Sequence, residues 1–104
     1  VAGRPIAVTF SYSHRLRHMA DWYAQLLAES LGKRTGRDGS EVLAGPTPVR
    51  AVGVTDQHSQ SQLYMEGPHD KWFTLFSVDH PDHQVPIPAD FSDLPALEYL
   101  GGRR

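Results

Sequence analysis

The stretch PIAVTFSYSHRLRHMADWYAQLLAESLGK, residues 5–33, decides the fold. It begins with a short apolar and partly β-branched run, Pro5 to Phe10, which is typical of a buried strand. A helical period follows from about His14 to Leu31, and its apolar positions share one broad arc. A serine, Ser11 or Ser13, is expected to cap this helix. A strand followed at once by an amphipathic helix indicates an α/β layer.

The rest of the chain continues this alternation. The further elements that we expect are a strand at Val49–Val54, a helix capped by Thr55 or Asp56 and stopped by Gly67, a strand at Lys71–Val78 and a short helix capped by Ser92. Residues 32–46 are Gly-rich and are expected to form a loop after a helix C-cap at Gly32. The order β-α-β-α-β plus a tail predicts a parallel sheet in one α/β domain spanning residues 1–104.

Composition excludes several classes of protein. The chain has 104 residues, of which 39% are hydrophobic and 21% charged, so one modest core is expected. A formal net charge of −2 gives no basic footprint for nucleic acid, and no apolar run approaches the roughly 20 residues of a membrane span. The lack of cysteine rules out disulfides and thiolate metal sites and fits a reducing cytoplasm. A start at VAGRPIAV and an end at GGRR lead us to expect a piece of a longer chain.

Glu29 is the first candidate catalytic residue. Helical spacing places it beside Trp22, at the border of the apolar arc and in the last turn of its helix. Desolvation by the indole and the negative end of the helix dipole would both raise the pKa of its carboxyl group, as suits a proton-abstracting base. Helical spacing alone leaves a second interpretation open, in which Glu29 is a boundary residue paired with a nearby Arg or Lys.

The segment TDQHSQSQLY, residues 55–64, holds the second candidate. His58 falls in the first turn of its helix, where the positive helix end favours a neutral imidazole that can both donate and accept. The neighbouring amides and hydroxyls are the groups that bind neutral sugar oxygens. The open alternatives are a histidine that caps its own helix and a self-satisfied polar network.

Other histidines carry weaker signals. His80 and His83 stand near two aspartates, but the intervening Pro81 and the lack of a third ligand at helical spacing favour an ordinary loop. His14 and His18 lack the glutamate and third ligand of a zinc-binding helix. We therefore expect no metal site.

Two blocks of sequence carry a family resemblance. DWYAQLLAESLGK, residues 21–33, and GPTPVRAVGVTDQHSQSQLYMEGPHDK, residues 45–71, resemble the phosphoglucose isomerase family in its bacterial form. The resemblance runs from about Pro5 to Gly102. It implies a partial sugar-isomerase (SIS) domain, a flavodoxin-like three-layer α/β fold, belonging to the second of two such domains.

The resemblance also implies roles for individual residues. Glu29 matches the base that moves a proton between C2 and C1 of the open-chain sugar through a cis-enediol, without metal or cofactor. His58 matches the histidine that assists ring opening and that reaches the active site of the neighbouring subunit of a homodimer. Gln57 and Ser59 become candidates for substrate binding. The implied reaction interconverts glucose 6-phosphate and fructose 6-phosphate in the cytoplasm.

The family's other active-site parts have no match in the chain. These are a Gly-Gly-Arg segment upstream of the matched region, a Ser/Thr-rich phosphate loop and a C-terminal helix with a lysine and a glutamine; Gly101-Gly102-Arg103 lies downstream and is no substitute. We therefore expect the 104-residue chain to be inactive alone. Two alternatives stay open: a phosphosugar-binding module without catalysis, and an interaction fragment that self-associates through exposed apolar surface.

Overall fold

The computed structural model describes residues 3–91 and 93–103. Its strands are β1 (Ile6–Ser11), β2 (Lys33–Thr35), β3 (Glu41–Ala44), β4 (Thr47–Val52) and β5 (Lys71–Phe76). Its α-helices are α1 (Arg17–Leu31) and α2 (Thr55–Glu66), and its 3-10 helices are η1 (His14–Leu16) and η2 (Pro95–Leu100). The three expected main strands and two main helices are all confirmed. No helix in the described residues is long and apolar enough to cross a membrane.

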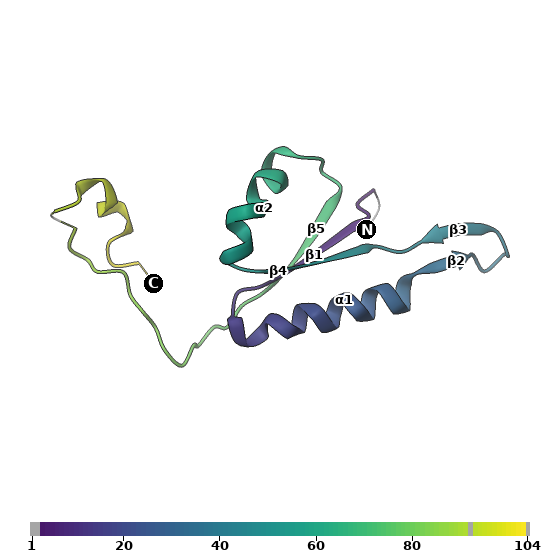
Figure 1. Cartoon of the computed structure of the whole chain (residues 1–104), viewed down its shortest axis with the longest axis horizontal. Helices are drawn as coiled ribbons and strands as arrows, with labels where there is room; N and C mark the ends of the chain where they lie inside the picture. Colours follow the sequence, from purple (N-terminus) through teal and green to yellow (C-terminus); the bar gives the residue numbers. More distant parts are fainter. Residues whose placement is uncertain (1–2, 92, 104) are drawn as a thin grey trace.

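The main sheet is parallel, with strand order β4-β1-β5 (Figure 1). The two helices α1 and α2 cover opposite faces of this sheet. Successive side chains of a strand point to opposite faces, so the strand residue that each helix contacts identifies the face that it covers. Tyr64 of α2 packs edge-on against Phe10, and Tyr23 of α1 packs edge-on against Phe76, whose strand neighbour Leu75 pairs with Phe10. The predicted three-layer α/β arrangement is therefore confirmed. The first strand lies in the centre, as in flavodoxin-like sheets.

The core is small and centred on β1. Val8, Phe10 and Ala51 form a buried cluster on the α2 face, with Tyr64 packed against it. The buried side chains of α1 are those of Ala20 and Leu27. Many large apolar side chains remain exposed outside this core, including Trp22 at 56% and Leu75 at 62%. Exposed apolar area on this scale marks surfaces that are built to be covered.

Phe10→Ala is expected to destabilise the chain by about 3–5 kcal/mol, because it removes the aromatic side chain of this buried cluster and leaves a cavity. That is a large share of the roughly 5–15 kcal/mol that stabilises a typical domain. Urea unfolding followed by circular dichroism measures the change. The control Val85→Ala alters a side chain that is 91% exposed and is expected to change stability by less than about 0.5 kcal/mol. Equal midpoints for the two variants would contradict the placement of the core.

The expectation of a loop at residues 32–46 is wrong. β2 and β3 pair antiparallel, and their hairpin extends beyond the end of α1 (Figure 1). The turn is held by local bonds: Asp38 accepts hydrogen bonds from the N–H and Oγ of Ser40 at 3.1 and 2.7 Å. Gly39 adopts a φ of +84°, which glycine reaches without strain. All the strand residues are exposed, so no alternating apolar pattern announces the hairpin.

The predicted helix caps are only partly right. Ser13 makes no capping bond, and Ser11 instead donates its Oγ–H to the carbonyl of Leu16 at 3.0 Å. α2 begins after Val54, so neither Thr55 nor Asp56 is its N-cap. Gly32 does terminate α1, as expected. The expected final helix is a 3-10 turn, η2, and Ser92, its proposed cap, lies outside the described residues.

The chain after β5 forms an arm that leads away from the sheet (Figure 1). The end of this arm folds back on Ile87, because the N–H of Ile87 donates to the carbonyl of Arg103 and the N–H of Gly102 donates to the carbonyl of Ile87. The radius of gyration is 19.0 Å, against about 13 Å for a compact domain of this size. The arm therefore adds length to the molecule without enlarging its core.

Candidate active site

Glu29 lies in the last turn of α1, as expected, with its side chain exposed. Trp22, expected to desolvate it, is itself mostly exposed, so the half-buried environment predicted for the carboxylate is wrong for this chain. The alternative of a boundary ion pair is also wrong, since no cation contacts Glu29 within the described residues. Its carboxylate is thus accessible to a substrate or to another protein surface.

His58 lies in the first turn of α2 and is exposed. It makes no capping bond, which excludes the simplest alternative for it. Ser59 is exposed and donates its hydroxyl to the carbonyl of Asp56 at 3.1 Å, while Gln57 is half-buried.

The other two amide side chains of α2 each form a hydrogen bond within the helix. Gln60 accepts a hydrogen bond from the hydroxyl of Tyr64, and Gln62 donates to Glu66 at 2.6 Å. The polar network proposed as an alternative therefore exists in part, but it does not include the imidazole of His58.

The structure does not bring Glu29 and His58 together. α1 starts beside the carboxyl ends of the strands and runs back along the sheet, so Glu29 lies about 18 Å further on, at the amino edge. His58 follows β4 directly and lies at the carboxyl edge, on the opposite face of the sheet (Figure 1). Within one copy these two residues cannot act on one small substrate.

A cluster of charged side chains that the sequence did not reveal lies between α1 and β4. Arg50 donates to Asp21, whose other carboxylate oxygen lies 2.9 Å from His18 Nδ1. These two hydrogen bonds, the one from Arg50 first, lower the pKa of Asp21. Asp56 accepts the N–H of Val52 at 2.7 Å and so fixes the start of α2 relative to β4. Asp21, Arg50 and Asp56 line a hollow of about 280 Å³. Sequence patterns missed this pairing because Asp21 and Arg50 are 29 residues apart in the chain.

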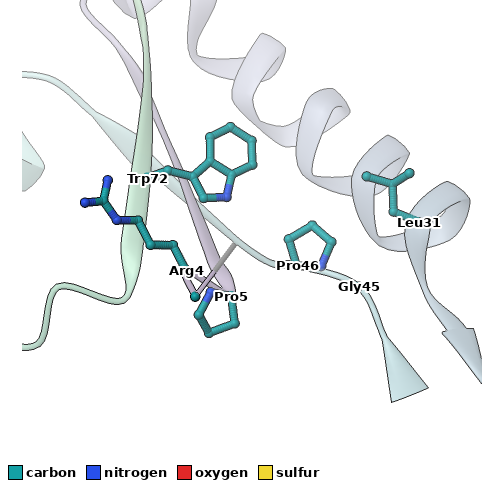
Figure 2. Close-up of a pocket in the computed structure, with 7 residues that line it drawn as sticks. Arg4, Pro5, Leu31, Gly45, Pro46 and Trp72 are labelled. Carbon is teal, nitrogen blue, oxygen red and sulfur yellow. The ribbon is translucent and has the colours of Figure 1, made fainter. Parts of the chain in front are cut away.

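Two larger hollows lie at the two edges of the sheet. At the amino edge, Trp72, Leu31 and Pro46 line a space of about 480 Å³ (Figure 2), and the buried indole N–H of Trp72 has no partner among the described residues. At the carboxyl edge, Tyr12, Ser13 and residues 80–83 line a space of about 710 Å³. Neither Glu29 nor His58 lines either hollow. Within residues 3–91 and 93–103, no group of three His, Asp or Glu is placed to hold a metal ion.

Comparison with known proteins decides the relationship. No protein-family model matches the chain. A glucose-6-phosphate isomerase from Carboxydothermus hydrogenoformans is 54% identical over 100 residues, which cover 96% of this chain and 22% of that protein. One from Rubrobacter xylanophilus is 48% identical over 100 residues, 96% of this chain and 21% of that protein. This chain is homologous to the glucose-6-phosphate isomerases.

A solved structure supports the same relationship. The crystal structure of a hypothetical protein from Thermus thermophilus is 44% identical and superposes with a TM-score of 0.74, over 94% of this chain and 23% of that one. The resemblance drawn from residues 21–33 and 45–71 is thereby confirmed. The chain spans about a fifth of the length of the glucose-6-phosphate isomerases that it matches.

Proposed function

We propose that this chain supplies two catalytic residues of a glucose-6-phosphate isomerase. Glu29 is the base that transfers a proton between C2 and C1 of the open-chain sugar through a cis-enediol. His58 assists opening of the sugar ring. The substrate is a phosphosugar, interconverted between glucose 6-phosphate and fructose 6-phosphate, and residues 1–104 form part of an SIS domain. The lack of cysteine fits work in a reducing cytoplasm.

The placement of Glu29 and His58 at opposite edges of the sheet carries the proposal. Both side chains are exposed, and no described ion pair occupies either of them. They fit one reaction only if each active site takes Glu29 from one copy and His58 from another. In a homodimer with a twofold axis the two sites are then equivalent, because each copy supplies Glu29 to one site and His58 to the other.

Gln57 and Ser59 are proposed to bind substrate hydroxyls beside His58. Ser59 uses its O–H within the helix but keeps its oxygen as an acceptor, and Gln57 has an amide with both donor and acceptor atoms. Asp56 acts on these residues indirectly, because its bond to the N–H of Val52 sets where the first turn of α2 lies.

A chimeric enzyme tests the proposal. In it, this chain replaces the matched 100-residue segment of the Carboxydothermus hydrogenoformans isomerase. We expect the chimeric isomerase to interconvert glucose 6-phosphate and fructose 6-phosphate, and the purified 104-residue chain to show no turnover above buffer in the same coupled assay. A folded chimeric protein without activity, or turnover by the 104-residue chain alone, would contradict the proposal.

A further inference from the structure

A short junction joins β4 to the helix that carries His58. β4 ends at Val52 and α2 begins at Thr55, so two residues lie between them. The N–H of Gly53 donates to the carbonyl of Ser11 at 3.1 Å, which ties the junction to the end of β1. Because a junction this short has little slack, a displacement of Gly53 is passed on to the first turn of α2.

The ring of Tyr12 lies against the backbone of Gly53. A Cβ added at Gly53 would stand 2.6 Å from both Cδ1 and Cε1 of Tyr12 and 2.9 Å from its Cγ. Carbon atoms in contact normally lie about 3.5–4.0 Å apart, so a side chain at this position needs a displacement of about 1 Å. The φ of Gly53 is outside the left-handed region, so the requirement for glycine here is one of space.

Tyr12 is itself held in place. Its N–H donates to the carbonyl of Phe76 at 2.7 Å, which joins the end of β1 to the end of β5. Its ring centroid lies 6.0 Å from that of Phe10, two residues earlier on the same face of the strand. Phe10 is buried and packs edge-on against Tyr64 of α2. The ring that limits the space at Gly53 therefore belongs to the packed face of the sheet that α2 covers.

A second contact ties the first turn of α2 back to β4. The half-buried carboxylate of Asp56 accepts the N–H of Val52 at 2.7 Å. Successive helical residues are about 100° apart, so His58 lies about 200° around the helix from Asp56. A helix held with Asp56 toward the strand must turn His58 away from it, and His58 is exposed.

We propose that Tyr12 and Gly53 are positioning residues for His58. The ring of Tyr12 sets how closely the junction approaches the end of β1, and the bond of Asp56 then sets the direction in which the first turn of α2 faces. Tyr12 and Gly53 act through the imidazole and not by contact with substrate. Their role depends on the proposed part of His58 in opening the sugar ring.

Gly53→Ala in the chimeric isomerase tests this role. The added methyl group displaces the junction by about 1 Å, and a misplacement of that size costs about 100-fold in rate. We therefore expect kcat for glucose 6-phosphate to fall about 100-fold, with KM within a few-fold of the unmutated value.

The matched control is Gly36→Ala in the β2–β3 hairpin. Its methyl group would also meet close atoms, Asp38 Oδ1 at 2.9 Å and Ser40 Oγ at 3.1 Å, but these are the ends of exposed side chains on a different element from His58. Gly36→Ala should keep kcat within about twofold of the unmutated value.

Variants of Tyr12 test whether its ring is the contact that matters. Tyr12→Phe keeps the ring carbons and should retain full activity, whereas Tyr12→Ala removes the contact and should lower kcat about 10-fold. Tyr12→Ala also makes room for a methyl group at position 53. The double variant Tyr12→Ala, Gly53→Ala should therefore be about 10-fold more active than Gly53→Ala alone.

A His58→Ala background separates positioning of the imidazole from a general loss of folding. Without the imidazole, Gly53→Ala should lower kcat by less than about threefold, because no ring-opening group is left to misplace. Full activity of Gly53→Ala, an equal loss with and without His58, or a loss that Tyr12→Ala does not relieve would each overturn the inference.

The same set of variants distinguishes this inference from the proposed function. A fall of kcat in His58→Ala, together with full activity in Gly53→Ala, would overturn the positioning role and leave the proposed function standing. Full activity in His58→Ala would overturn both.

Discussion

Glu29→Gln in the chimeric isomerase is expected to lower kcat by about 10²–10⁴-fold, while KM stays within a few-fold of the unmutated value. The amide keeps the size and shape of the side chain but cannot accept the C2 proton. Because Glu29 is exposed and forms no described ion pair, the change removes no contact that supports the fold. Steady-state kinetics in both directions, with the unfolding midpoint as a check on folding, measure the effect.

The matched control is Glu98→Gln, another exposed glutamate, which lies in η2. It should retain full activity. The same experiment separates the isomerase from a phosphosugar-binding module without catalysis. A binding module would show no turnover before or after Glu29→Gln, and it would still bind the phosphosugar after the change. Full kcat in Glu29→Gln, with normal folding, would remove Glu29 from the mechanism.

The main sheet could be predicted from sequence because its strands are continuous apolar runs next to a helix with a clear apolar face. Pro5–Phe10 and Lys71–Val78 match β1 and β5 within two residues. Such runs follow from burial on both faces of a parallel sheet. The β2–β3 hairpin escaped prediction because its residues are exposed and its turn depends on local bonds of Asp38. Helix caps escaped because Ser11 and Asp56 bond to other backbone groups.

The candidate site could be predicted only as two separate residues. Periodicity placed Glu29 and His58 on their helices, and both lie there. It could not show that α1 carries Glu29 to the amino edge while β4 leaves His58 at the carboxyl edge, because that separation depends on the direction in which each helix crosses the sheet. The predicted burial of Glu29 failed because Trp22, the side chain expected to desolvate it, is itself 56% exposed. Assignment of roles to these residues came from the resemblance and stays a prediction.

The central claim is that each active site combines Glu29 of one copy with His58 of the other. Its most direct test mixes two inactive chimeric isomerases, Glu29→Gln and His58→Ala, under conditions that let subunits exchange. In a mixed dimer, one site receives both altered residues and the other receives neither. Random exchange should therefore restore about a quarter of the unmutated activity, from two proteins that each retain less than about one hundredth.

The control mixes Glu29→Gln protein with a Glu29→Gln, His58→Ala double variant, and should stay inactive because every site then lacks its base. Activity in the first mixture near one quarter, with none in the control, is the predicted result. If the first mixture stays as inactive as its components although mass spectrometry shows that mixed dimers have formed, Glu29 and His58 do not meet across two copies, and the account is wrong.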